Sequence, residues 1–420
     1  MPKIASISEV VSSRLCIGCG ACAYASSGAY RMIDYPEEGI RPYKAIPIIE
    51  PEVETACLSV CPSVQIDYSH FDNESSHPDL TPSFKKKWGH ITESWEGYAT
   101  DPEIRFKGSS GGALTAISAY CIEKLGMTGT LHIAQDPQNA TRNKTTLSKT
   151  RDDLMAAAGS RYSPASVCDG LRLVEEAASP CVIVGKPAEI AAVRNTEKIR
   201  PALKSKVGVT LSFFCAETPP TRATEELVKE LKVDRSNLTA VRYRGHGWPG
   251  YFTTTDDQDR QSQHLIYQKS WAYLQKFRPW STQIWPDGSG ELADISCGDP
   301  WYEEPDGENP GFSLVLARSR KGKEIIEGAM ATGYLNLEKA ELWKIEASQI
   351  GLLRKKASTH GRRLAMRTMG MPTTRFVAEG SRFCWSRLSS GDKFKTYFGT
   401  LRRIIQRNLR QPLILKNDSE

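Results

Sequence analysis

The sequence predicts a mixed fold, in which an α/β body follows a small cysteine-rich module and precedes a basic helical tail. The first observation is the alternation of short apolar runs of strand length with helical patterns through the middle of the chain. The second is the position of the cysteines, because five of the 11 fall within the first 61 residues. The third is the charge of residues 354–420, which hold 16 Lys and Arg against 4 Asp and Glu.

Length and composition limit the class of protein. A chain of 420 residues predicts two or three domains at roughly 150 residues each. Hydrophobic residues make up 40% and charged residues 25%, which is ordinary globular composition and excludes a disordered or collagen-like chain. Because no apolar run reaches the roughly 18 residues of a membrane-spanning helix, and no apolar signal segment is visible, we expect a cytoplasmic protein.

The predicted domain boundaries follow these changes of composition. Residues 1–75 are the cysteine-rich module, 90–325 the α/β body and 326–420 the helical basic region. Residues 70–87, rich in Asp, Ser, Pro and Lys, are predicted to be a linker. Within the body, strands are expected at 129–134, 181–184, 207–214 and 312–317, and a helix over 113–125.

The amino-terminal cysteines have the spacing of an iron–sulfur protein. Cys16, Cys19 and Cys22 form a C-x2-C-x2-C motif, and Cys61 is followed by Pro62. In the two-cluster bacterial ferredoxin pattern, each cluster takes three cysteines at this spacing and its fourth from the Cys-Pro of the other repeat. We therefore predict a ferredoxin-like module in which one 4Fe–4S cluster is held by Cys16, Cys19, Cys22 and Cys61.

A second cluster is not expected in this module. The remaining positions of the pattern are Ser26, Pro51, Glu54 and Cys57, and one thiol among them cannot hold iron. Cys57 is therefore predicted to be left over from a degenerate repeat. A zinc site is the alternative, because zinc also binds C-x2-C pairs, but the double spacing followed by Cys-Pro favours iron–sulfur.

Two turns before predicted helices have the composition of anion sites. Residues 107–112 open the helix over 113–125, and residues 184–189 place Lys186 after a buried strand. Glycines leave backbone N–H groups exposed at the positive end of a helix dipole, where phosphate binds. Ordinary capping is the alternative, because serine- and glycine-rich helix starts often bind nothing. Neither turn matches the Rossmann or P-loop fingerprint.

Several phrases occur together in an order that resembles one family. They are Lys107-Gly-Ser-Ser-Gly-Gly112, Ala158-Gly-Ser-Arg-Tyr162, Val184-Gly-Lys-Pro187, Phe213-Phe-Cys-Ala-Glu217, Arg242-Tyr-Arg-Gly-His-Gly-Trp-Pro-Gly250 and Glu291-Leu-Ala-Asp-Ile-Ser-Cys-Gly-Asp-Pro-Trp301. With the cysteine module they cover roughly residues 10–320. The chain resembles the beta-subunit family of coenzyme F(420)-reducing hydrogenases and dehydrogenases, and in particular the branch found with polysaccharide genes.

The resemblance implies an FAD in the α/β body, with electrons passing between the flavin and iron–sulfur clusters. It also implies which residues line the flavin and its phosphates: Ser109, Ser110, Gly111, Gly112, Gly159, Ser160, Arg161, Tyr162, Lys186, Arg242 and Arg244. Asp294 and Asp299 are expected either to shape the same cleft or to serve as turn and cap residues. No catalytic residue is assigned, although His246, Tyr162 and Tyr243 are candidate proton donors.

The family pattern also contains ligands of a second cluster, which this chain lacks. Members often carry cysteines at the positions that here read Ala188, Cys215, Thr282 and Trp285. Since three of the four are replaced together, the resemblance implies that this cluster is absent and that Cys215 is structural.

The resemblance therefore implies a flavin-dependent iron–sulfur oxidoreductase that passes electrons between one 4Fe–4S cluster and FAD. Its expected partners are an electron donor or acceptor protein such as a ferredoxin, and a small-molecule substrate that the sequence does not identify. The alternative is a non-catalytic accessory or electron-transfer subunit in surface-polysaccharide biosynthesis, because the missing second cluster shortens the electron relay.

The basic tail contains an amphipathic helical pattern over residues 393–409. Its apolar face consists of Phe394, Phe398, Leu401, Ile405 and Leu409. A basic amphipathic helix favours contact with an anionic membrane, which would place the protein at the inner face of the membrane. Packing of this face on the protein's own core is the alternative. No nucleic-acid partner is expected, because the tail lacks a recognisable nucleic-acid-binding fold.

Overall fold

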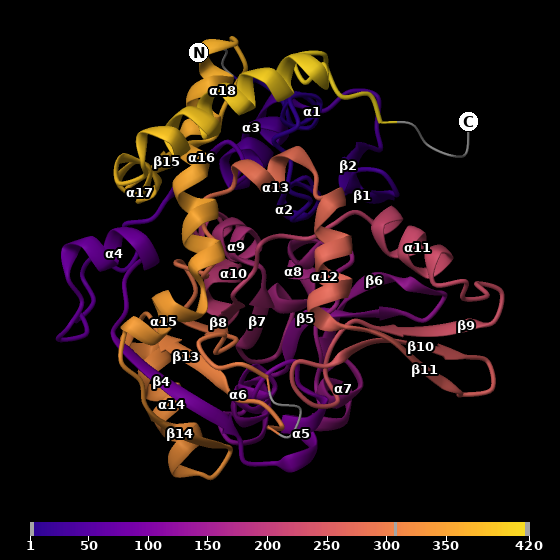
Figure 1. The fold of residues 1–420 in the computed structure, drawn as a ribbon, viewed down its shortest axis with the longest axis vertical. Coiled ribbons are helices and arrows are strands. Elements are labelled where there is room, and N and C mark those ends of the chain that lie inside the picture. Colours follow the sequence, from indigo (N-terminus) through magenta and orange to yellow (C-terminus); the bar gives the residue numbers. More distant parts are fainter. Residues whose placement is uncertain (1–3, 306–308, 416–420) are drawn as a thin grey trace.

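An eight-stranded mixed sheet forms the centre of the molecule (Figure 1). The computed structural model describes residues 4–305 and 309–415. The strands lie in the order β14, β4, β13, β12, β8, β7, β5, β6. Their bounds in that order are Leu335–Lys339, Glu93–Ala99, Ser313–Ala317, Ile295–Gly298, Val207–Phe213, Cys181–Gly185, Thr130–Asp136 and Asn139–Ser148.

The four central strands, β12, β8, β7 and β5, run parallel. The outer strands pair antiparallel on both sides. Parallel strands are covered on both faces and need apolar side chains on both. In β7, Ile183 packs into the core on one face and Val182 into the core on the other. The predicted α/β class of the body is confirmed, and β5, β7, β8 and β13 form where strands were expected.

Helices cover both faces of the sheet. On one face α6 (Ala113–Glu123) and α14 (Arg320–Ala331) share a core that contains Ile117 and Ile326. On the other face α9 (Pro187–Ile199) packs Ile190 against the sheet. The helix expected over 113–125 is therefore present, and it ends two residues early.

The amino-terminal module consists of short elements that pack on the α9 side. They are α1 (Ile7–Ser12), α2 (Ala21–Ala25), β1 (Tyr30–Tyr35), β2 (Gly39–Lys44), α3 (Pro51–Val60) and β3 (Gln65–Asp67). Strands β1 and β2 form an antiparallel hairpin. Strand β3 pairs in parallel with β15 (Arg375–Val377), which joins the module to the carboxyl-terminal region.

The other elements connect these parts. A three-stranded antiparallel sheet contains β9 (Leu238–Arg242), β10 (Tyr251–Asp256) and β11 (Gln261–Ile266). The remaining helices are α4 (Pro82–Trp88), α5 (Pro102–Lys107), α7 (Arg151–Ala156), η1 (Val167–Gly170), α8 (Leu171–Glu175), α10 (Pro201–Lys206), α11 (Thr221–Glu230), α12 (Tyr267–Leu274), η2 (Gln275–Phe277), α13 (Trp280–Ile284), α15 (Trp343–Ser348), α16 (Ile350–Thr368), α17 (Ser381–Ser386) and α18 (Ser390–Gln406).

Helix α4 forms inside the segment that the composition suggested as a linker. The hydroxyl of Thr81 accepts a hydrogen bond from the Phe84 amide, and Pro82 occupies the first helical turn, where its missing N–H costs nothing. Trp88 at the end of α4 is buried in a small core with Leu316 and Ile345. This segment is therefore packed against the body.

The two ends of the chain share one hydrophobic core, and α1 and α18 lie near each other in Figure 1. Cys57 of the module and Ile404 of α18 belong to this core, together with Trp280 and Met366. The amide of Leu413 donates to the carbonyl of Ser12 over 2.8 Å. The carboxyl-terminal region is thus part of the structure that supports the cysteine module.

Helix α18 leaves most of the predicted apolar face exposed. Ile404 and Leu409 are buried, whereas Phe394, Phe398 and Ile405 are 61%, 48% and 63% exposed. The reason is the contact with α16, where a Cβ on Gly361 would stand 2.7 Å from the hydroxyl of Thr396. This close approach fixes the rotation of α18. No helix within the described ranges is both long and apolar enough to cross a bilayer.

Asp294 joins the sheet to the helices on either side. Its carboxylate accepts hydrogen bonds from the Thr210 amide of β8 (2.9 Å), the Arg194 guanidinium of α9 (3.0 Å) and the Ser319 hydroxyl that caps α14 (2.8 Å). Burial opposes its ionisation, but Arg194 and the Thr210 amide hold the pKa of Asp294 at about 2. Asp294 is therefore a structural group of the core.

We expect Asp294→Asn to lower the free energy of unfolding at pH 7 by about 3 kcal/mol, because the buried Arg194 loses one of its two carboxylate partners and keeps only Glu197. The difference in unfolding free energy between the variant and the wild type should become smaller as the pH falls from about 4 toward 2, because the wild-type carboxylate also becomes protonated there. Urea unfolding at several pH values measures both effects. Asp257→Asn, at an exposed position, is the control, and equal stability of the two variants would contradict the structural role.

Candidate functional site

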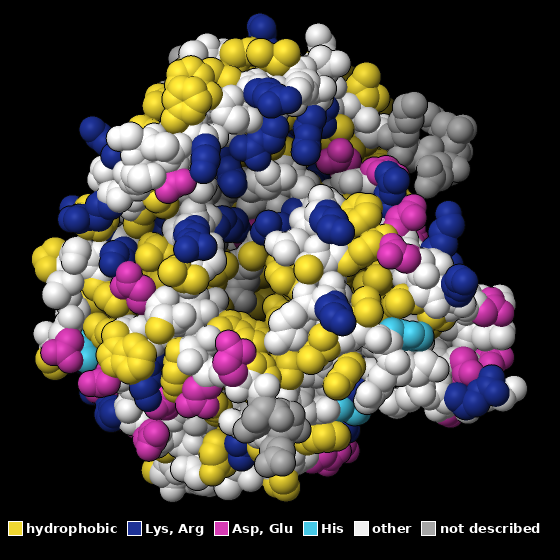
Figure 2. Space-filling model, viewed as in Figure 1, with side chains coloured by type: hydrophobic (Ala, Val, Ile, Leu, Met, Phe, Trp, Pro, Cys, Tyr) yellow, Lys and Arg dark blue, Asp and Glu magenta, His cyan; other side chains and the backbone are white. Residues whose placement is uncertain are grey.

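A cavity of about 720 Å³ lies at the carboxyl ends of the parallel strands. Gly185 of β7, Phe213 of β8 and Gly298 of β12 line it. Open α/β sheets bind ligands at this edge, and the volume falls within the roughly 300–1,000 Å³ of small-molecule and cofactor sites. The hollow is visible near the middle of the face in Figure 2.

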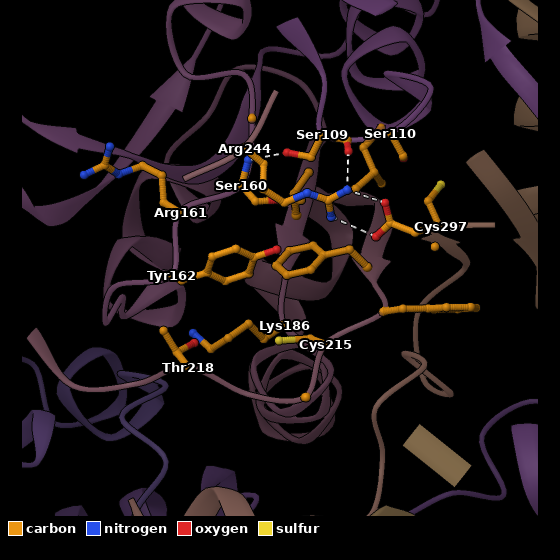
Figure 3. Close-up of a pocket in the computed structure, with 18 of the residues that line it drawn as sticks. Ser109, Ser110, Ser160, Arg161, Tyr162, Lys186, Cys215, Thr218, Arg244 and Cys297 are labelled. Atoms are coloured by element: carbon orange, nitrogen blue, oxygen red, sulfur yellow. Dashed lines mark hydrogen bonds and ion pairs between the residues drawn. The ribbon is translucent and has the colours of Figure 1, made fainter. Parts of the chain in front are cut away.

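The structure brings most of the residues implied by the family resemblance to this cavity (Figure 3). Gly111 and Arg242 are not among the lining residues. The Arg242 guanidinium instead contacts the carbonyl of Gly245 and the side chain of Gln261. The residues that do line the cavity are Ser109, Ser110, Gly112, Gly159, Ser160, Arg161, Tyr162, Lys186 and Arg244.

The loop before α6 offers free backbone donors. The hydroxyl of Ser109 accepts a hydrogen bond from the Ser160 amide over 2.6 Å, which ties two cavity loops together. Gly111 lies behind this loop, where its amide donates to Ser313 and a Cβ would stand 2.6 Å from the Gly97 carbonyl. Within the described ranges, the amides of Ser109, Ser110 and Gly112 have no hydrogen-bond partner. The loop can therefore donate to an anionic group at the start of α6.

Arg244 is buried and organises one side of the cavity. Its guanidinium forms a two-point ion pair with Asp299 (2.9 and 2.6 Å) and donates to the carbonyl of Ser109 over 2.6 Å. It also lies 4.1 Å from the ring centre of Tyr267, which stacks on Trp301. The charge of Arg244 is thus compensated, and its role here is to hold the cavity wall in place.

The two remaining predicted cations are also bound by protein groups. Lys186 is buried, and its ammonium lies 2.5 Å from the Glu189 carboxylate in the first turn of α9. The guanidinium of Arg161 points away from the cavity in Figure 3 and donates to the carbonyls of Val241 and Ala140. Arg161 therefore fastens the loop to β6 and β9, while Lys186 remains at the cavity wall.

The candidate proton donors lie in different surroundings. Tyr162 lines the cavity among aromatic rings, and burial raises its pKa, so its hydroxyl stays protonated at neutral pH. The Tyr243 hydroxyl is buried and shares a hydrogen bond of 2.8 Å with Thr224. Burial and then the charge of Arg242 lower the pKa of His246, which does not line the cavity. Among the three, Tyr162 alone lies at the cavity.

The four predicted cluster ligands lie close together. Cys16 follows α1, Cys22 lies within α2, and Cys61 follows α3. Burial and then the thiols of Cys19 and Cys16 raise the pKa of Cys22, and the same causes raise the pKa of Cys61. The Gly18 amide donates to the Cys16 sulfur over 3.4 Å. Four mutually interacting thiols with a backbone donor fit the ligand set of a cubane cluster.

Cys57 is placed differently from these four. Its thiol donates to the carbonyl of Cys22 over 3.4 Å, and burial raises its pKa to about 12. It therefore packs beneath α2. Across residues 4–305 and 309–415, no group of three or more His, Cys, Asp or Glu side chains is arranged to hold a single metal ion.

The cysteine module meets the cavity at Cys19. The carbonyl of Cys19 accepts a hydrogen bond of 2.9 Å from the Cys168 amide of η1. The hydrogen bond to the Cys168 thiol, the main influence, lowers the pKa of Cys19, while the charge of Glu189 raises it and that of Lys186 lowers it. Lys186 and Glu189 both line the cavity. The charges of this ion pair therefore act on the Cys19 thiol, and its side chains form part of the cavity wall.

The four positions of the missing second cluster do not form a thiol site. Ala188 and Trp285 are buried in the same core, and Thr282 lines a smaller recess. Cys215 lines the cavity, and its sulfur accepts a hydrogen bond from the Glu217 amide.

The two aspartates that were expected either to shape the cleft or to serve as turn and cap residues have different positions. Asp299 lines the cavity and pairs with Arg244, whereas Asp294 lies in the core.

Sequence reasoning did not locate part of the cavity wall. Tyr267 lies outside every recognised motif, and Trp301, which ends the phrase that contains Asp299, was not singled out as a site residue. The residues of α16 were visible only as part of the basic tail, and Arg354, Lys355 and Arg362 line the cavity. The excess of positive charge was the available signal, but its place in the fold depends on tertiary packing.

Two family models match the chain. Residues 94–172 match the model described as coenzyme F(420) hydrogenase/dehydrogenase, beta subunit N-term, and residues 180–342 match its C-terminus counterpart. The coenzyme F(420) hydrogenase subunit beta of Methanosarcina barkeri is 24% identical over 248 residues, which span 58% of this chain and 80% of that protein. The coenzyme F(420)-dependent sulfite reductase of Methanocaldococcus jannaschii is 22% identical over 354 residues, which span 80% of this chain but only 49% of that protein.

A solved structure agrees with the family match at the level of the fold. One chain in the structure of the F(420)-reducing nickel–iron hydrogenase complex from Methanosarcina barkeri superposes with a TM-score of 0.54 at 20% sequence identity. The match covers 71% of this chain and 98% of that chain. Because the two family models together span more than half of the sequence, the chain belongs to the coenzyme F(420) hydrogenase/dehydrogenase beta-subunit family.

Proposed function

We propose that this chain is an oxidoreductase that holds one FAD in the cavity and one 4Fe–4S cluster on Cys16, Cys19, Cys22 and Cys61. The observation that carries the proposal is the Lys186–Glu189 pair, whose charges act on the Cys19 thiol and whose side chains line the cavity. Electron transfer between two bound groups requires such proximity. A bound flavin supplies exchange between a hydride and single electrons, and a cluster carries one electron at a time.

The cavity residues suit a flavin in three respects. The unpartnered amides of the Ser109–Gly112 loop can donate to phosphate oxygens at the start of α6. Tyr162, Tyr267 and Trp301 supply apolar ring surfaces. Arg244 holds the Ser109 loop and Tyr267 at a fixed separation through its hydrogen bonds and ring contact.

The module residues suit a cluster that exchanges electrons with a partner protein. Gly18 and Gly20 adopt positive φ values of 74° and 90°, which allow the backbone to turn closely around the thiols. Cys16 and Cys61 are partly exposed, whereas Cys19 and Cys22 are buried. A cytoplasmic electron donor or acceptor such as a ferredoxin would therefore approach on the Cys16 and Cys61 side, while a small-molecule substrate would enter the cavity.

Similarity to a hydrogenase subunit supports a role beside other subunits. The Methanosarcina barkeri relative is a subunit of an F(420)-reducing hydrogenase complex. We infer that this chain likewise exchanges electrons within an assembly. An accessory subunit that keeps the cluster but binds no flavin is the competing function, and the flavin content of the purified protein separates the two.

Substitution of two cysteines tests the proposal. We expect Cys16→Ser to remove most of the iron and the broad visible absorption of the cluster while the bound flavin is retained. Cys57→Ser is the matched control, because Cys57 is a thiol of the same module that donates only to a backbone carbonyl. It should keep both iron and flavin. Iron analysis and visible spectra before and after dithionite, on protein purified without oxygen, provide the readout.

Three results would contradict the proposal. Loss of iron in Cys57→Ser to the same extent as in Cys16→Ser would mean that the ligand set is wrong. Zinc in place of iron in the wild type would establish the alternative metal site. A wild type that contains iron but takes up no added FAD would support the accessory subunit.

We also infer that the exposed face of α18 contacts an anionic membrane surface. Phe394, Phe398 and Ile405 are exposed on a helix that also carries exposed Lys395 and Arg402, which is the composition of an interfacial helix. The other side of the helix is occupied, since Ile404 packs in the core shared by the two chain ends.

Vesicle sedimentation tests this contact. We expect the protein to pellet with vesicles that contain anionic lipid and not with purely zwitterionic vesicles, because both apolar insertion and charge attraction are needed. The double variant Phe394→Ser/Phe398→Ser should stay in the supernatant, whereas Leu173→Ser, at an exposed apolar position elsewhere, should behave as the wild type. Equal behaviour of the two variants would overturn the inference.

A further inference from the structure

One wall of the cavity is made by elements outside the central sheet. Helix α16 and the segment before α13 contribute four cations, which are Arg278, Arg354, Lys355 and Arg362. The matched family models end at residue 342, before α16 begins. In Figure 2, dark-blue side chains gather above the hollow.

These four cations differ from the other three in the cavity lining. Lys186 and Arg244 are paired with Glu189 and Asp299, and Arg161 is bound to backbone carbonyls. In contrast, within the part of the chain that the structure describes, no carboxylate forms an ion pair with any of the four: Arg278, Arg354, Lys355 and Arg362. Unpaired charges on a cavity wall are unusual, because a buried charge is normally compensated.

Their polar atoms are only partly satisfied by the protein. The Arg278 guanidinium donates to the carbonyls of Ala216 and Gln275, and Arg362 donates to the carbonyl of Gln283. The Lys355 ammonium is buried and has no hydrogen-bond partner among the described residues, and the same holds for Nε of Arg362. The wall therefore presents donors that lack acceptors.

The neighbouring charges do not neutralise this wall. Burial, with Arg278 and Arg362 nearby, lowers the pKa of Lys355 to about 8, although Glu217 and Cys215 act in the opposite direction. Burial and then the charges of Arg403 and Arg278 lower the pKa of Arg362 to about 10. The cations repel one another, and a bound anion would relieve this repulsion through charge-assisted hydrogen bonds.

We propose that Arg278, Lys355 and Arg362, with Arg354 at the exposed edge, form an anion-binding subsite for a substrate that carries a phosphate or carboxylate group. The assignment rests on the proposed flavin site, since it places the substrate in the same cavity. Figure 3 shows Ser109 and Arg244 on one side of Tyr162 and Cys215 on the other. Arg278 is on the Cys215 side, because its guanidinium donates to the carbonyl of the neighbouring Ala216 over 2.9 Å. The charge of Lys355 interacts with both Arg278 and Cys215. The subsite is thus separate from the Ser109 loop assigned to the flavin phosphates.

Binding of inorganic pyrophosphate to the full-length, cofactor-loaded protein tests the proposal. Titration calorimetry should show saturable binding to the wild type that is at least tenfold weaker in Lys355→Met, because a charged hydrogen bond contributes roughly 1.5–3 kcal/mol. Lys355→Arg should retain most of the affinity. The matched control is Arg367→Met, which removes an exposed cation from the same helix without touching the cavity.

Flavin and iron contents of every sample separate this inference from the proposed function. We expect Lys355→Met to bind pyrophosphate more weakly than the wild type and to contain the same amount of flavin. Arg354→Met, at the exposed edge, should also weaken pyrophosphate binding without disturbing the fold. No binding to the wild type, or equal weakening in Lys355→Met and Arg367→Met, would overturn the subsite. Loss of flavin from a folded Lys355→Met variant would also overturn the subsite, because the cations would then bind the phosphates of the flavin itself. A wild type without flavin would contradict the proposed function and, with it, the substrate subsite that rests on that function.

Discussion

The Lys186–Glu189 ion pair is the interaction on which the rest of the site depends. It is buried, spans 2.5 Å and closes the first turn of α9, the helix that follows central strand β7. A buried ion pair contributes little net stability compared with apolar packing, so its position is more informative than its energy. It forms part of the cavity wall, and its two charges also influence the pKa of the Cys19 thiol. Any movement of α9 would change the cavity and the module together.

The hydrophobic core shared by the two chain ends also couples the cavity to the cysteine module, but over a longer distance. Because Met366 and Ile404 pack with Cys57 and Leu15, the carboxyl-terminal helices cannot be removed without exposing the underside of the cysteine module. The same packing orients α16 so that Lys355 and Arg362 reach the cavity while Arg363 turns to Glu379. One helix thus supports the module and supplies the cationic wall. This arrangement explains why a tail that is so basic in sequence contributes to the functional centre.

The sequence was sufficient for the parts of the fold that depend on local pattern. Continuous apolar runs predicted β5, β7, β8 and β13, because strands covered on both faces consist mostly of apolar residues. The motifs predicted that Ser109, Tyr162, Lys186 and Arg244 would meet, and they line one cavity. The direction of Arg161 could not be predicted, since its guanidinium is drawn to carbonyls of β6 and β9 that are distant in sequence. The burial of Ile404 in place of Ile405 could not be predicted from the apolar pattern of the helix, because the close contact with α16 at Gly361 decides it.

The most direct test of this account is the cofactor content of the wild-type protein purified without oxygen. Iron, acid-labile sulfide and flavin should be present at close to four, four and one per chain, and dithionite should bleach the absorption of both chromophores. These values follow from four clustered thiols and one cavity that share the Lys186–Glu189 wall. Close to eight irons per chain would contradict the single-cluster account, and a protein that contains neither iron nor flavin after reconstitution would contradict the proposed oxidoreductase as a whole.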